Sequence, residues 1–157
     1  MRTLLKKFEQ AFGTSAQIKN FGRSDLFMIE IGSDRMIEAS AWLRMEESFR
    51  MDYLENLSVY EAKDHLFVSA FIRSLTHHHH LVLRTSVAIH GANESVSFPS
   101  LVGVWSQAEP FEAEISPLFG IHFTGSERAR SIQKNFGNFG GGYPLRKSFD
   151  WGEEFKP

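Results

Sequence analysis

The stretch that decides the fold is residues 57–87, LSVYEAKDHLFVSAFIRSLTHHHHLVLRTSV, in which three segments alternate in character from one residue to the next. A period of two is typical of strands that bury one face of a sheet. Only residues 62–64 and 74–80 separate the three segments. Because connections this short join neighbouring antiparallel strands, the stretch predicts an antiparallel meander.

Upstream of the meander, the spacing predicts a helix and two strands. Apolar residues recur at helical intervals over residues 2–12, and Gly13 can end that helix in a left-handed conformation. The basic residues of this helix also allow a membrane-surface role, but packing on the same domain is the commoner use of such a helix. Short strands are expected at residues 16–21 and 26–31, around a turn at 22–25.

A second helix is expected to start at Ser33 or Asp34, either of which can cap it, and to run to about Glu47. Its candidate buried residues are Met36, Ile37, Ala41, Leu43 and Met45. Downstream of the meander, residues 95–98 predict one more short strand.

These elements predict an α+β fold, a largely antiparallel β-sheet packed with α-helices. We expect one domain over residues 1–133, because no repeat or low-complexity linker interrupts it. Residues 134–157, rich in aromatic residues and glycine, are expected to form an extended C-terminal arm.

Composition excludes several classes of protein. A chain of 157 residues is large enough for one domain with a core, and its net charge of −2 argues against nucleic-acid binding, which usually needs a concentrated basic face. There is no cysteine, which excludes a disulfide, a thiolate zinc site and a cysteine-ligated iron–sulfur cluster within this chain. No apolar run approaches the roughly 20 residues of a membrane-spanning helix. The first residues are expected to be too polar for a signal peptide.

The most conspicuous candidate metal ligands are His77, His78, His79 and His80. Consecutive residues of a strand point to opposite faces, so few of the four can face one ion, and a further ligand must come from elsewhere. A solvated hairpin loop is therefore the favoured interpretation, and no metal ligand is predicted.

Candidate catalytic residues are equally sparse. Glu112 and Glu114 resemble a carboxylate pair for acid–base chemistry, but residues two apart diverge in a strand and in a helix. His122 lies between apolar neighbours, where a hydrogen-bonded structural role is commoner than a redox or proton-relay role. The glycines at 140–142 lack the preceding strand and following helix that make a phosphate-binding loop. No catalytic or cofactor-binding residue is predicted, and a stand-alone enzyme that uses Glu112 or His122 is the alternative.

The tail from residue 134 points to a protein partner. It carries six aromatic residues among glycines and prolines: Phe136, Phe139, Tyr143, Phe149, Trp151 and Phe155. Irregular structure cannot bury all six side chains within the domain, and their exposure to solvent would favour aggregation. Docking on a partner would bury several, each contributing about 1.5–3 kcal/mol. The alternative is that the tail folds back on its own sheet, and both descriptions can hold in part.

Residues 99–149 also resemble a known family signature, through P-S, W-x-x-A, E-x-E, F-G-I-x-F-x-G and G-x-P-L-R-K-x-F in this order. The stretch is similar to the thirty-kilodalton subunit family of respiratory complex I, which supplies the C subunit of NADH-quinone oxidoreductase. The matching positions are Pro99, Ser100, Trp105, Ala108, Glu112, Glu114, Phe119, Gly120, Ile121, Phe123, Gly125, Arg130, Ile132, Gly142, Pro144, Leu145, Arg146, Lys147 and Phe149. The departures, mostly at charged positions of the family pattern, are Ala113, Pro117, Ser126, Glu127, Ser131 and Ser148.

The resemblance implies a non-catalytic, cofactor-free structural subunit in the peripheral arm of an NADH-quinone oxidoreductase complex. Flavin, iron–sulfur clusters and quinone are then expected in partner subunits, and the complex lies on the cytoplasmic or matrix face of an energy-transducing membrane. The implied partners are the quinone-site subunit, of the forty-nine-kilodalton type, and the adjacent iron–sulfur subunit.

The residues expected to contact those partners are Glu112, Glu114, Phe119, Arg130, Arg146, Lys147 and Phe149. Because several family charges are missing, the alternative is the equivalent subunit of a membrane-bound [NiFe] hydrogenase or of a ferredoxin-fed relative of complex I.

Overall fold

The computed structural model describes residues 2–20, 26–91, 94–126 and 142–152. The helices in chain order are α1 (Arg2–Phe12), the 3₁₀ turns η1 (Gly13–Ser15) and η2 (Ser33–Arg35), α2 (Met36–Met45) and α3 (Ala108–Phe119). The strands are β1 (Ala16–Asn20), β2 (Phe27–Ile31), β3 (Tyr53–Ala62), β4 (His65–Arg73), β5 (His80–Ala88), β6 (Val96–Pro99) and β7 (Ile121–Thr124).

The main sheet has five strands in the order β1-β2-β5-β4-β3. The predicted meander is confirmed, since β4 pairs antiparallel with both β3 and β5. The predicted strands β1 and β2 also pair antiparallel with each other. The pairing of β2 with β5 is parallel, and Glu30 of β2 lies opposite Arg84 of β5. The α+β class with a largely antiparallel sheet is therefore confirmed.

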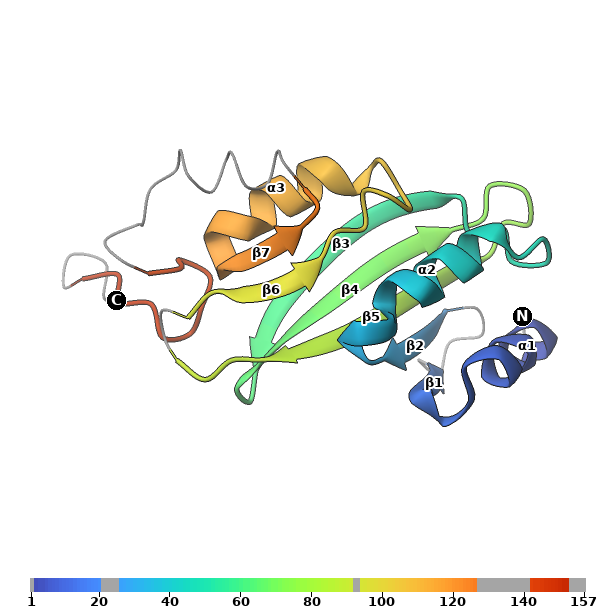
Figure 1. The fold of residues 1–157 in the computed structure, drawn as a ribbon, viewed down its shortest axis with the longest axis horizontal. Coiled ribbons are helices and arrows are strands. Elements are labelled where there is room, and N and C mark those ends of the chain that lie inside the picture. The colour runs from blue at the N-terminus through green and yellow to red at the C-terminus, as the bar shows by residue number, and fades with distance from the viewer. Residues whose placement is uncertain (1, 21–25, 92–93, 127–141, 153–157) are drawn as a thin grey trace.

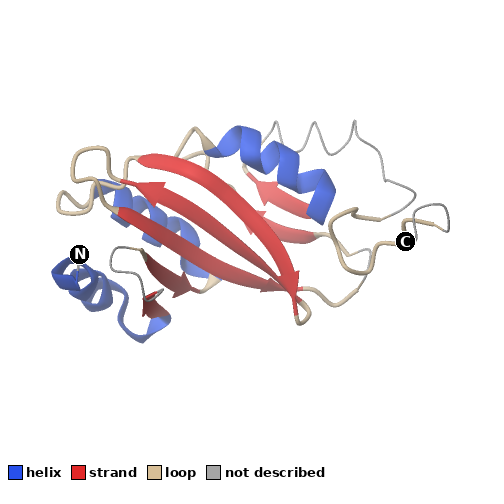
Figure 2. Cartoon of the chain, turned by 180° about the vertical axis from the view of Figure 1, so that it is seen from behind, coloured by secondary structure: helices blue, strands red, loops and turns tan. Residues whose placement is uncertain are grey.

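The helices α2 and α3 lie on one face of this sheet, together with the small parallel sheet of β6 and β7 (Figure 1). Figure 2, seen from behind, shows β3, β4 and β5 in front of both helices. The core lies in the layer between, where strand residues such as Leu66 and Leu83 belong to the same buried cluster as Met36 and Leu43 of α2. None of the helices in the described part of the chain has the length and apolar character needed to cross a bilayer.

The first helix packs on the domain, as predicted. Leu5, Phe8 and Phe12 are buried, and the ring of Phe8 stacks on Phe12 at a centroid distance of 4.3 Å. The Phe8 ring also meets the edge of Trp42 in α2 at 5.5 Å. The apolar stripe of α1 is thus covered by the chain itself.

The start of the second helix differs from the sequence prediction. A 3₁₀ turn, η2, precedes α2, and the N-cap positions of η2 and α2 are occupied by Gly32 and Arg35 instead of Ser33 or Asp34. Among the predicted core residues, Met36 and Leu43 are fully buried, whereas Met45 is 82% exposed. Met45 is exposed because it lies in the last turn of the helix, away from the stripe that faces the sheet.

The structure adds a helix, α3, where no element was predicted. Its buried positions recur three and four residues apart, as one face of a helix requires: Ala108, Glu112, Ile115 and Phe119. Two prolines and a buried carboxylate obscure this periodicity in the sequence. Pro110 lies in the first turn, where a missing backbone N–H is tolerated, whereas Pro117 lies in the last turn and removes one donor from the helix ladder.

A glycine joins α3 to β7. Gly120 has φ of +66° and caps the helix in the left-handed conformation that glycine adopts most readily. Its N–H donates to the carbonyl of Ser116 at 3.0 Å. A Cβ at this position would lie 2.3 Å from the Tyr143 ring, so close packing also requires glycine.

Candidate functional site

The signature residues assemble into two neighbouring parts of the structure. We call residues 96–126, which contain β6, α3 and β7, the cap. We call residues 142–152, which cross the end of α3, the strap. In Figure 1 the strap is the red segment beside the start of β6 and the cap.

Glu112 is the polar centre of the cap. Its side chain is fully buried in the inward face of α3. Oε2 accepts a hydrogen bond from Ser100 Oγ at 2.7 Å, and Oε1 accepts one from the Leu101 N–H at 2.6 Å. Burial raises the pKa of Glu112, while the bonds from Ser100, Leu101 and Ser126 act in the opposite direction. The carboxylate therefore holds the β6–α3 loop and the end of β7 to the helix.

Trp105 fixes the same loop to the rest of the domain. Its side chain is almost completely buried, and Nε1 donates to the backbone carbonyl of Met51 at 2.9 Å. Arg44 of α2 donates from Nη1 to the carbonyl of Val104. The cap is thus joined to the end of α2 and to the segment that enters β3.

Arg146 performs the corresponding role in the strap. It is only 3% exposed, and Nε donates to the carbonyl of Phe119 at 2.8 Å. Nη2 donates to the carbonyl of Glu94 at 2.7 Å, and the guanidinium lies 5.1 Å from the centroid of the Tyr143 ring. The cation thereby meets the carbonyl end of α3, where a positive charge is favourable. Burial lowers the pKa of Arg146, and nearby acidic groups partly compensate.

Backbone bonds align the rest of the strap. The Leu145 N–H donates to the Leu118 carbonyl at 3.1 Å, and the Lys147 N–H donates to Glu61 Oε2 at 2.8 Å. Two large apolar side chains nevertheless remain on the surface, since Leu145 is 50% and Trp151 is 55% exposed. The strap is therefore fixed on its inner side and presents apolar groups on its outer side.

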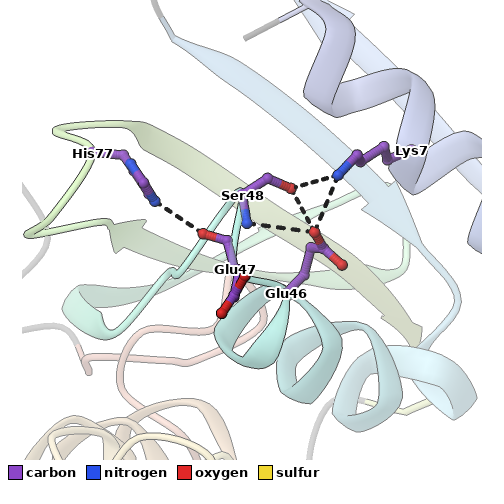
Figure 3. Close-up of polar contacts among 5 residues, drawn as sticks. All are labelled: Lys7, Glu46, Glu47, Ser48 and His77. Carbon is purple, nitrogen blue, oxygen red and sulfur yellow. Dashed lines mark hydrogen bonds and ion pairs between the residues drawn. The ribbon is translucent and has the colours of Figure 1, made fainter.

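A second polar cluster lies at the opposite end of the sheet (Figure 3). Lys7 Nζ of α1 donates to Ser48 Oγ at 3.1 Å and lies 3.3 Å from Glu46 Oε1. The hydroxyl and N–H of Ser48, with Lys7, lower the pKa of Glu46. One residue away, the Glu47 carbonyl lies 2.9 Å from His77 Nε2. The cluster links α1, the turn after α2 and the β4–β5 connection.

A comparison with known protein families identifies the family to which the chain belongs. The family described as "Respiratory-chain NADH dehydrogenase, 30 Kd subunit" matches residues 29–155. The chain belongs to this family. The match covers the main sheet from β2 onward, the cap and the strap, and it confirms the resemblance seen in the signature residues.

Individual family members are related at moderate identity. The NADH-quinone oxidoreductase C subunit of Roseiflexus sp. strain RS-1 is 32% identical over 135 residues, which are 84% of this chain and 74% of the relative. The C subunit of Cupriavidus taiwanensis is 29% identical over 157 residues, covering 94% of this chain and 75% of the relative. The chain spans 56% of the length of the Azorhizobium caulinodans C subunit, to which it is 28% identical.

Two solved structures share the fold. A chain from the archaeal membrane-bound sulfane sulfur reductase, a respiratory membrane complex, has a TM-score of 0.76 at 17% identity, covering 96% of this chain and 85% of that one. The trypsin-resistant fragment 1–134 of Nqo5 has a TM-score of 0.63 at 20% identity, covering 80% of this chain and 98% of the fragment.

In this member of the family, the seven predicted contact residues do not form one surface. Glu112, Phe119 and Arg146 are buried, and the Phe119 carbonyl and Arg146 are bonded to each other. Glu114 and Lys147 are exposed, Phe149 is half-buried, and Arg130 lies outside the described residues. The first three thus have internal partners, and contact with another protein of the complex stays a prediction for all seven.

The tail also differs in part from the expected arm. Residues 142–152 fold back on the domain through the bonds of Arg146, Leu145 and Lys147, which is the alternative considered for this tail. Residues 134–141 and 153–157, with the aromatic residues at 136, 139 and 155, lie outside the described residues. The division at residue 133 stays a prediction.

The remaining candidates are separate from one another. His122 is half-buried in β7, opposite Ser97 of β6. His77, His78 and His79 lie in the β4–β5 connection and His80 is the first residue of β5, at the far end of the sheet from the strap. Over residues 2–20, 26–91, 94–126 and 142–152, no group of three or more His, Asp or Glu side chains is arranged to hold a metal ion.

The residues that sequence reasoning missed act through backbone groups or packing. Tyr143 packs on Gly120, and Glu94 supplies a carbonyl to Arg146. Neither pairing has a sequence pattern, because the partners lie far apart in the chain and one of them is a main-chain atom. Trp105 and Ser100 were visible only as members of the signature.

Proposed function

We propose that the chain is a non-catalytic structural subunit in the peripheral arm of a complex I-like NADH-quinone oxidoreductase. The observation that carries this proposal is the family match over residues 29–155. It is supported by two relatives, both named as the C subunit of NADH-quinone oxidoreductase, that align with most of the chain.

The proposed role is to hold the quinone-site subunit, of the forty-nine-kilodalton type, and the adjacent iron–sulfur subunit in a fixed relative position. The internal bonding of Glu112 and Arg146 favours this role, because it makes the cap and strap a preorganised unit. Leu145, Lys147 and Trp151 then form the outward side. Because Leu145 and Trp151 are about half exposed, burying the rest of each side chain against a partner would contribute about 1–1.5 kcal/mol.

The redox chemistry of such a complex is assigned to its other subunits. Flavin, iron–sulfur clusters and quinone would be bound by those partners, and this chain would sit on the cytoplasmic or matrix face of the membrane. Its contribution would be to keep the distances between cofactors constant.

A related complex is the second candidate. The sulfane sulfur reductase chain matches 96% of this chain in fold, which makes a respiratory complex with a different electron donor the alternative. A membrane-bound [NiFe] hydrogenase or a ferredoxin-fed relative of complex I belongs to the same class of alternatives.

Co-purification tests both candidates. The chain is tagged at its N-terminus, isolated from detergent-solubilised membranes and analysed by mass spectrometry. Recovery of a quinone-site subunit with NADH-oxidising flavoprotein subunits supports the complex I proposal. Recovery of the quinone-site-like subunit with nickel hydrogenase or ferredoxin-dependent components supports the alternative. Recovery of the chain as a monomer without partner subunits would refute both candidates.

A further inference from the structure

The four histidines at 77–80, of which the last is the first residue of β5, have different environments. The His77 N–H donates to Ser74 Oγ at 3.1 Å, and the Ser74 N–H donates to the His79 carbonyl at 2.9 Å, which closes the turn. His78 has φ of +56° and is exposed. The rings on either side of it, those of His77 and His79, stack at a centroid distance of 5.7 Å with 23° between their planes.

His80 is directed to a different neighbour. Its Nδ1 lies 3.4 Å from Glu55 Oε2 across the sheet. Two of the four imidazoles are therefore paired with each other, one faces a carboxylate and one faces solvent. A uniformly solvated histidine run would not show this division.

The hydrogen bond of His77 determines which of its nitrogen atoms is free. Nε2 lies 2.9 Å from the backbone carbonyl of Glu47 (Figure 3). A carbonyl oxygen only accepts, so Nε2 carries the proton and the neutral ring presents the lone pair of Nδ1. Metal-binding histidines commonly donate their second ring N–H to a backbone carbonyl, which fixes the tautomer and the ring orientation.

We propose that His77 and His79 form a two-histidine site for a divalent first-row transition-metal ion such as Zn²⁺ or Cu²⁺, with water as the other ligands. Imidazole nitrogen suits both ions. Two nitrogen atoms that bind one ion tetrahedrally at about 2.1 Å lie about 3.4 Å apart. The ring centroids lie 5.7 Å apart, so the His79 side chain has to rotate to bring one of its nitrogen atoms to this separation, while His77 keeps its bond to Glu47.

The site is open and independent of the subunit function proposed above. It has two protein ligands, in agreement with the lack of any three-residue metal cluster among the described residues. The bound ion would hold the β4–β5 connection in its present turn, and through the His77–Glu47 bond it would hold the connection to the segment after α2.

The test is a calorimetric titration of the purified full-length chain with Zn²⁺. We expect one ion per chain, and binding at least tenfold weaker in His77→Gln and in His79→Gln. Glutamine at 77 keeps an N–H donor for the Glu47 carbonyl, so the turn is retained. His78→Gln and His80→Gln are the matched controls, and their affinity should stay within about twofold of the unmodified chain.

A second measurement needs no variant of the site. The chain has seven histidines, and substoichiometric Cu²⁺ broadens the NMR signals of ¹⁵N-labelled imidazoles close to the ion. Broadening that is strongest at His77 and His79 supports the site. The proposal is overturned by equal broadening at His78 and His80, by a His78→Gln variant that weakens binding as much as the others, or by the absence of saturable binding.

Discussion

The meander and the cap with its strap are built on different principles. In β3, β4 and β5 the backbone ladder runs along the strands with one register shift, between Leu54 and Asn56, and apolar residues such as Leu66 and Leu83 repeat along each strand. In the cap and strap, two buried charged side chains, Glu112 and Arg146, bond to groups from segments far apart in sequence. Stability in the meander is shared among many equivalent contacts. In the cap and strap it depends on single residues that no neighbour can replace.

The largest expected effect comes from removing the carboxylate of the cap. Glu112→Ala leaves Ser100 Oγ and the Leu101 N–H without their acceptor, and hydrogen bonds to charged groups are worth about 1.5–3 kcal/mol each. We expect a loss of about 4 kcal/mol in the free energy of unfolding, measured by urea denaturation.

The matched variants compare the two regions. Leu83→Ala, in the centre of the meander, is expected to cost about 2–5 kcal/mol through its cavity. Glu112→Gln keeps one acceptor oxygen and should recover more than half of the loss. If Glu112→Gln were as destabilising as Glu112→Ala, the carboxylate bonds would not be what holds the cap.

The next effect is local to the strap. Arg146→Ala leaves the carbonyls of Phe119 and Glu94 without their donors, so the strap should detach at a cost of about 3 kcal/mol. Hydrogen exchange should show faster exchange at the N–H groups of Leu145 and Lys147, while the meander stays protected.

Arg146→Lys provides the control for this prediction. A lysine supplies one point charge and cannot reach both carbonyls with the geometry of a guanidinium, so an intermediate effect is expected. Unchanged protection at Leu145 in the alanine variant would show that backbone bonds alone retain the strap.

A smaller effect is the pH dependence that Glu112 introduces. Burial raises the folded pKa of this group above its ordinary value of 4.5, so the folded state binds the proton more tightly than the unfolded state. The stabilisation that comes from protonated Glu112 is fully present below the pKa of this group in the unfolded state. It is lost as pH rises through its pKa in the folded state. Glu112→Gln cannot titrate, so its stability relative to the unmodified chain should increase with pH, by about 1.4 kcal/mol for each unit of pKa difference.

This dependence is measured by urea denaturation of both chains at several pH values across that window. A stability difference that stays constant with pH would contradict the raised pKa of Glu112. Leu83→Ala serves as a reference, because it carries no titrating group and should keep a constant difference from the unmodified chain.

The smallest effect on the isolated chain is expected on the outer side of the strap. Lys147→Ala combined with Trp151→Ala should change the free energy of unfolding by no more than about 0.5 kcal/mol, since the Lys147 side chain is exposed and Trp151 is more than half exposed. The same variant should reduce recovery of the quinone-site subunit in the co-purification and lower NADH-quinone activity of the membranes. Intact assembly and activity would exclude these two residues as contacts.

The parts of the fold that sequence could predict are those with a regular period. The helix at Arg2–Phe12 and the five strands of the main sheet follow from spacing alone, because their apolar residues repeat. The helix α3 was not predicted, since Glu112 occupies a core position and prolines lie in both end turns. The same carboxylate was noticed through the signature but interpreted as a contact with another protein.

The internal bonds of Glu112 and Arg146 could not be predicted from sequence, and contact with another protein stays a prediction for both. Arg146 bonds to backbone carbonyls, which every residue has, and Glu112 bonds to one backbone N–H and to serine hydroxyls, which are common in any sequence, so their partners leave no recognisable pattern. A sequence also does not show whether a charged residue bonds within its own chain or to a partner, so Glu112 and Arg146 could be assigned to either. Only the structure shows that the side chains of Leu145 and Trp151 are exposed.

The strap has a consequence for the order of synthesis. The Lys147 N–H meets Glu61, 86 positions earlier in the chain, and Arg146 meets the carbonyls of Glu94 and Phe119. On the ribosome the meander can form well before these bonds exist, and the Phe119 carbonyl at the end of α3 lacks its Arg146 donor until residue 146 emerges. A nascent chain that stops short of that point would carry a folded sheet with two bare carbonyls, a form that chaperones and proteases can distinguish from the finished protein.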